Sequence, residues 1–96
     1  MIGVVATLTV QAGKEEEFEG IFRELSGLVR ANEPGNHFYQ LTKTRGDEPV
    51  YKVLELYADQ DALVLHGKTD YFRAAGAKMA GTLAAKPQIE YLDAVI

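Results

Sequence analysis

Apolar residues occupy every even position from Ile2 to Val10, and smaller or more polar residues fill most odd positions between them. Side chains of a strand alternate between its two faces, so this pattern predicts a β-strand with one strongly buried face. From residue 14 to about residue 30 the apolar residues recur at helical steps, from Phe18 to Val29. The change of period predicts a mixed α and β domain.

The rest of the chain divides into further short elements. Glu33-Pro34-Gly35-Asn36 ends the first helix, and the Pro-Gly pair fits the centre of a type II turn. Two segments rich in β-forming residues and joined by a short loop predict a hairpin. Asp59 and Thr69 are suited to cap two short helices. The predicted strands of this part of the chain span residues 37–44, 50–58 and 88–95.

The resulting order is β-α-β-β-α-β, with the second helical segment broken in two. This order is typical of the α+β ferredoxin-like fold, in which an antiparallel four-stranded sheet carries its helices on one face. The last strand is apolar on both faces, which suggests that the open face of the sheet is covered by a second copy of the chain. A chain of 96 residues predicts a single domain over residues 1–96.

Composition argues against several function classes. The formal net charge is −4 and no basic run occurs, so nucleic acid is a poor candidate partner. Cysteine is absent and the two histidines lack metal-binding spacing, so we expect no metal site. The apolar first ten residues are too short to span a bilayer and lack a charged start. We therefore expect no membrane association and a cytoplasmic location.

Four short motifs follow one another along the chain. They are Glu33-Pro34-Gly35 directly before a strand, a strand that ends in Glu55, an aromatic residue and an acidic cap, then Ala62-Leu63-x-x-His66, then Thr69-x-x-Phe72. In this order they resemble the antibiotic biosynthesis monooxygenase (ABM) family. The resemblance implies a homodimer, a dimeric α+β barrel, with a pocket between the sheet and the helices of each subunit.

The resemblance also implies a set of possible functions. Some ABM members oxygenate quinols or polycyclic phenols without metal or flavin, which makes a cofactor-independent monooxygenase acting on a small aromatic substrate our first expectation. A non-catalytic dimeric module, either small-molecule-binding or stress-associated, is the alternative. Other members degrade haem, but the places of their key residues hold Ala6, His66 and Gly76 here. The axial histidine is therefore missing, and haem binding is disfavoured.

Two residues are candidates for the chemistry. Oxygenation of a phenol without a cofactor needs a base that removes the hydroxyl proton near neutral pH, and histidine suits this task. His66 follows Ala62 and Leu63 on the apolar side of its helix, where it is either this base or a core histidine bonded to a backbone carbonyl. Glu55 would orient His66 if its strand face points to the helices; otherwise it is a surface or interface residue.

Four further residues are candidates for substrate binding. Asn36 could orient a substrate oxygen, although asparagine at such a place is often a turn residue. Aromatic side chains could line the pocket, or serve only in core and dimer packing. The aromatic candidates are Tyr39, Tyr57 and Phe72.

Overall fold

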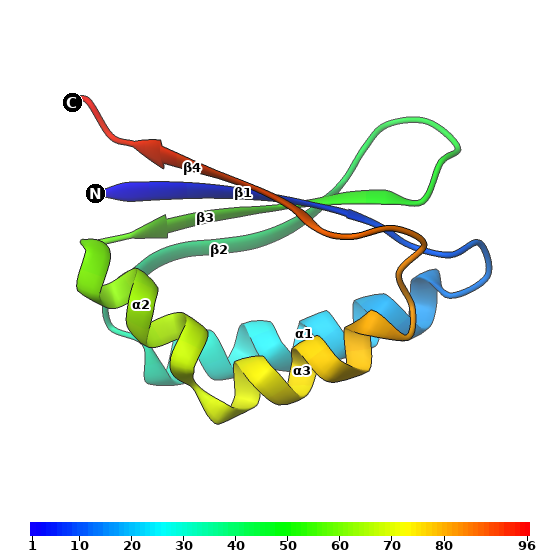
Figure 1. Cartoon of the computed structure of the whole chain (residues 1–96), viewed down its shortest axis with the longest axis horizontal. Coiled ribbons are helices and arrows are strands. Elements are labelled where there is room, and N and C mark those ends of the chain that lie inside the picture. Colours follow the sequence, from blue (N-terminus) through cyan, green and yellow to red (C-terminus); the bar gives the residue numbers. More distant parts are fainter.

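The computed structural model describes all of residues 1–96, and its elements follow the predicted order (Figure 1). The helices begin or end within about two residues of their predicted bounds, and the break between the second and third helix falls at Thr69, the predicted cap of the third helix. The elements are β1 (Ile2–Thr9), α1 (Glu15–Asn32), β2 (Asn36–Lys43), β3 (Val50–Tyr57), α2 (Gln60–Lys68), α3 (Asp70–Ala80) and β4 (Gln88–Asp93).

The four strands form one antiparallel sheet in the order β2-β3-β1-β4. All three helices lie against the same face of this sheet, so the molecule has two layers (Figure 1). Val4 in β1 is paired with Glu55 in β3 on one side and with Tyr91 in β4 on the other. Residues in register share a face, so these three side chains point to the helices. The ferredoxin-like α+β fold is confirmed.

The core lies between β1, β3 and α1. Val4, Ala6, Leu8 and Val10 are all buried, as the alternation in the sequence predicted. The apolar stripe of α1 packs on them, and the ring of its Phe18 lies 4.8 Å from the ring of Tyr51 in β3. The inner face of β3 is therefore the one that carries Tyr51, Val53, Glu55 and Tyr57.

The caps of the two short helices are those that the sequence predicted. The Asp59 side chain accepts a hydrogen bond from the backbone N–H of Ala62 at 2.9 Å. The Thr69 hydroxyl oxygen accepts one from the N–H of Phe72 at 3.3 Å. Each cap occupies one of the donors that a helix start leaves unpaired.

The expected type II turn at Pro34-Gly35 is wrong. That turn needs a positive φ at its glycine, and positive φ values occur only at Gly13 and Gly46. Glycine is instead required at position 35 because the backbone there lies close to α2. A Cβ atom at Gly35 would lie 2.6 Å from the Cβ of Ala62. The turn thus holds the end of α1 directly against the first turn of α2.

The opposite face of the sheet is uncovered (Figure 1). Phe38, Leu56, Gly3 and Leu92 form a row across all four strands on this outer face. Phe38 is 50% exposed and Leu92 is 45% exposed. The edge strand β4 is also open toward the helical side, where Tyr91 is 64% exposed. None of the helices has the length and hydropathy needed to cross a membrane.

Candidate active site

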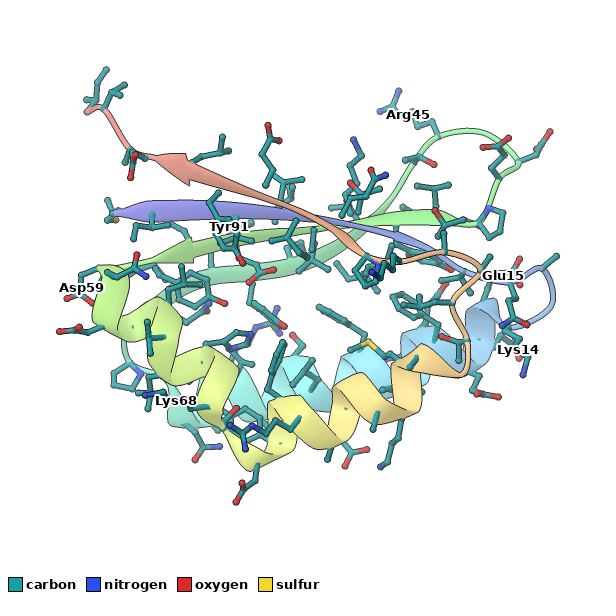
Figure 2. The ribbon with its side chains drawn as sticks, viewed as in Figure 1. Lys14, Glu15, Arg45, Asp59, Lys68 and Tyr91 are labelled. Carbon is teal, nitrogen blue, oxygen red and sulfur yellow. The ribbon has the colours of Figure 1, made fainter.

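A cavity of about 660 Å³ lies between the sheet and the two short helices. Its walls come from the inner faces of β1 and β4 and from α2 and α3, and most of its lining is apolar. Tyr91 stands on the helical side of β4 at this cavity (Figure 2). Its volume falls in the range typical of small-molecule sites. Besides two tyrosines, the titratable residues of the lining are Glu55, His66 and Asp93, and Asp93 lies at the exposed end of β4.

His66 is buried, with 4% of its surface exposed, and forms part of this lining. It lies in the last turn of α2, whose N-cap Asp59 and last residue Lys68 are labelled in Figure 2. The ring of Phe72 lies 4.5 Å from the His66 ring and that of Tyr39 lies 5.3 Å away. The imidazole is therefore held between aromatic side chains, which fix its position without competing for its nitrogens.

The partner of His66 is Glu33. Nδ1 of His66 lies 2.9 Å from Oε1 and 3.1 Å from Oε2 of this carboxylate, which is itself buried. The Tyr71 hydroxyl donates a second hydrogen bond to Glu33 Oε2. The expectation that Glu55 orients His66 is wrong, because the carboxylate at the end of α1 occupies the position beside Nδ1.

The hydrogen bond to Glu33 fixes the tautomer of His66. A carboxylate can only accept, so Nδ1 carries the proton, and Nε2 of the neutral ring keeps its lone pair. Nε2 has no hydrogen-bond partner in the protein, and no side-chain nitrogen or oxygen is both buried and unpaired. Nε2 is therefore accessible from the cavity as a proton acceptor.

The local backbone conformation determines where the Glu33 carboxylate lies. Its backbone N–H donates to the carbonyl of Val29 at 2.9 Å, which closes α1. Pro34 disfavours a helical conformation at the preceding residue, so Glu33 leaves the helix with φ −119° and ψ 87°. Its side chain then extends to His66 in α2. Sequence reasoning treated Glu33 only as part of the helix-ending turn, although His66 on an apolar face did require a polar partner.

Glu55 lines the cavity and accepts a hydrogen bond from the Tyr57 hydroxyl at 2.6 Å. Burial raises the pKa of Glu55 to about 7; the Tyr57 hydrogen bond opposes this rise, and the nearby charge of Glu33 adds to it. Burial and the neighbouring Glu55 hold the pKa of the Tyr57 hydroxyl far above its usual range, so this group stays a donor. The cavity thus contains a carboxyl group that changes its charge near neutral pH.

The other predicted binding residues divide into two groups. Tyr39 and Phe72 line the cavity. Asn36 does not, since its side-chain amide donates to the backbone carbonyl of Phe38 at 3.3 Å. Tyr57 is fully buried and does not line the cavity; its hydroxyl binds Glu55, and its ring lies 5.5 Å from that of His66. Register explains the placement of Asn36, which opens β2 at the end of the sheet.

The positions compared with haem-degrading relatives all belong to the cavity. Ala6, His66 and Gly76 contribute to its lining, and a Cβ added at Gly76 would meet no atom within 4 Å. The space where an axial histidine would stand is therefore open. No group of three or more His, Asp or Glu side chains converges closely enough to bind a metal ion.

The arrangement has clear relatives among known proteins. The sequence profile described as "Antibiotic biosynthesis monooxygenase" (ABM) matches residues 1–78. The chain belongs to the antibiotic biosynthesis monooxygenase family. A Bacillus subtilis (strain 168) protein named "Putative monooxygenase YcnE" is 34% identical over 85 residues, which are 88% of each chain.

Solved structures of the family share the fold. A crystal structure described as a putative antibiotic biosynthesis monooxygenase from Caulobacter crescentus CB15 is 62% identical, with a TM-score of 0.96 over 99% of this chain and 90% of its own. One with the same description from Nitrosomonas europaea is 18% identical, with a TM-score of 0.90 over the full length of both chains. The latter shows that the ABM fold persists where most residues differ.

Proposed function

We propose that this ABM protein is a monooxygenase that oxidises a quinol-like or phenolic aromatic compound with O2, without a metal or flavin. The observation that carries the proposal is His66, whose Nε2 is unpaired at an apolar cavity while Nδ1 is held by a buried carboxylate. Family membership and the names of the relatives support a monooxygenase. The quinol-like or phenolic substrate class is what the resemblance to ABM members implies, and the mostly apolar lining of the cavity is compatible with it.

The proposed reaction begins with removal of a substrate hydroxyl proton by Nε2 of His66. The resulting anion is a better electron donor to O2 than the neutral phenol, and the apolar lining keeps water from the reacting atoms. For a hydroquinone, one oxygen atom enters the ring and the other leaves as water, and the substrate supplies all the electrons. Glu33 stabilises the imidazolium that forms, because the two charges lie within hydrogen-bond distance.

Glu55 is the second catalytic residue in this proposal. Its carboxyl lies in the cavity with His66, and its pKa of about 7 lets it both hold and release a proton near neutral pH. We assign it to the protonation of an oxygen on the substrate. Tyr39 and Phe72 supply aromatic surface on which the substrate rings pack.

We also propose that the working form is a homodimer joined through the outer face of the sheet. The row of Phe38, Leu56, Gly3 and Leu92 is apolar, and Leu54 lies next to it on the same face of β3. Phe38, Leu54 and Leu92 are exposed, and no other part of the chain covers them. A second copy presents the same surface, so two copies related by a two-fold axis can cover each other's outer sheet face.

Oxygen uptake tests the activity. Benzene-, naphthalene- and anthracene-based hydroquinones and phenols are supplied to the protein in an oxygen electrode, and the uptake without protein is subtracted. We expect uptake with at least the bicyclic or tricyclic compounds, whose size suits the cavity. Thermal stabilisation by these compounds without any oxygen uptake would instead show a binding module that does not catalyse.

A further inference from the structure

Three polar side chains connect the cavity with the other side of the helical layer. His66 lines the cavity, and Nδ1 of its ring donates to Glu33. The half-buried Tyr71 donates its hydroxyl to the same carboxylate and also lines a separate groove of about 340 Å³ between α1 and α3. Glu33 therefore accepts hydrogen bonds from one residue of the cavity lining and from one residue of the groove lining.

No other hydrogen bond is made by the Glu33 carboxylate, which belongs to a residue that is 5% exposed. A proton that moves from His66 Nδ1 to this carboxylate can therefore reach water through Tyr71 without entering the cavity. Tyr71 thus places a second ionisable group, a hydroxyl, on the carboxylate that holds His66, and this hydroxyl belongs to a residue that also lines the groove.

We propose that Tyr71, Glu33 and His66 form a proton-transfer path that links the α1–α3 groove to the cavity. The proposal rests on the proposed function of His66 as the base. The proton-transfer path matters once a substrate fills the cavity, because His66 then has no contact with bulk water on the cavity side. Tyr71 is a positioning residue in this scheme, since it acts through Glu33 and does not touch the substrate.

Each transfer balances. Nε2 of His66 takes the hydroxyl proton of the substrate while the proton on Nδ1 passes to Glu33 Oε2. The Tyr71 hydroxyl turns toward the groove, releases its own proton to water and accepts the one from Oε2. His66 is then neutral with its proton on Nε2. When the reverse transfer through Tyr71 and Glu33 returns a proton to Nδ1, the ring can give its Nε2 proton to an oxygen of the substrate formed after O2 has reacted, and it ends neutral with its proton on Nδ1.

The test is hydrogen exchange of the His66 Nδ1–H, followed by NMR in protein labelled with 15N-histidine. It compares the wild type with Tyr71→Phe, which removes the hydroxyl and keeps the ring. Tyr91→Phe is the matched control, because Tyr91 lines the cavity and makes no hydrogen bond through its hydroxyl. Each protein is measured empty and with 2-naphthol filling the cavity, and backbone amide exchange at Val29 reports whether the fold is intact.

With 2-naphthol bound, we expect Tyr71→Phe to slow Nδ1–H exchange by about tenfold or more, and Tyr91→Phe to leave it unchanged. Equal rates in Tyr71→Phe and the wild type would overturn the path, as would wild-type exchange that stops when the cavity is filled. Failure of 2-naphthol to bind would count against the proposed function alone. The proton-transfer path would then be tested by the Nδ1–H exchange rates of the wild type and Tyr71→Phe without ligand. We expect slower exchange in Tyr71→Phe, and equal rates would overturn the path.

Discussion

At the scale of single residues, the site depends on two carboxyl groups, one buried and one partly buried, in different surroundings. Glu33 accepts hydrogen bonds from His66 and Tyr71. Glu55 has one hydrogen bond, from Tyr57, and the apolar cavity disfavours its charge. In the proposed mechanism the two groups serve different tasks: Glu33 pairs with the imidazole and passes its proton toward Tyr71, whereas Glu55 exchanges a proton with the substrate.

Glu55 makes the stability of the protein depend on pH. Its pKa rises from 4.5 in the unfolded chain to about 7 in the native state, so the native state keeps this proton in a range where the unfolded chain has lost it. Stability from this group is fully present below pH 4.5 and is lost as the pH rises through 7, by up to about 3 kcal/mol. Glu55→Gln keeps an acceptor for Tyr57 and cannot ionise.

We therefore expect Glu55→Gln to gain stability over the wild type as the pH rises. Urea unfolding at pH 4.5, 6 and 8 should show a difference between the two proteins that grows with pH. A difference that is the same at all three pH values would show that Glu55 does not hold its proton in the native state.

At the scale of elements, the contact between the 33–36 turn and α2 brings the site together. Gly35 lies against Ala62 in the first turn of α2, and His66 lies one helical turn further along. The backbone N–H of Ala58 also donates to the Gly35 carbonyl at 2.8 Å. Without this close approach, His66 could not reach Glu33.

Gly35→Ala should separate these elements. The new Cβ would lie 2.6 Å from that of Ala62, which forces α2 to move at a cost of about 1–3 kcal/mol. Gly20→Ala in the exposed part of α1 is the control, since a Cβ there meets no atom within 4 Å and should add roughly 0.5–1 kcal/mol. Thermal unfolding measures both. A Gly35→Ala protein as stable as Gly20→Ala would contradict this reading of the turn.

Much of the fold could be predicted from the sequence because the periodicity in β1 and α1, and the caps at Asp59 and Thr69, are local signals. His66 could be selected as a base for a similar reason, since its place in an apolar helix face is visible in the chain. Its pairing with Glu33 could not be predicted, because the two residues lie far apart in the sequence. Only the packing of Gly35 against α2 brings them together.

At the scale of the whole molecule, one face of the sheet is shielded by helices and the other is not (Figure 1). The exposed apolar row crosses every strand, and the edge strand β4 has no fully buried residue. The chain therefore has a large surface that is best covered by a symmetric partner.

Leu54→Lys should disrupt the proposed dimer. Leu54 lies on the outer face of β3 with 37% of its surface exposed, so a charge there would be buried in a dimer and hydrated in a monomer. Leu65→Lys is the control on the exposed side of α2, where Leu65 is 54% exposed. Sedimentation velocity should show a dimer for the wild type and Leu65→Lys, and a monomer for Leu54→Lys. A monomeric wild type would disprove the dimer.

The central claim is that the unpaired nitrogen of His66 removes the substrate proton. The most direct test compares the rate of oxygen uptake by His66→Ala with that by His37→Ala, using the best substrate of the hydroquinone panel. His37 is the other histidine of the chain and is exposed at the start of β2. We expect a rate about 10²–10⁴-fold lower for His66→Ala and an unchanged rate for His37→Ala. A wild-type rate in His66→Ala would show that His66 does not remove the substrate proton.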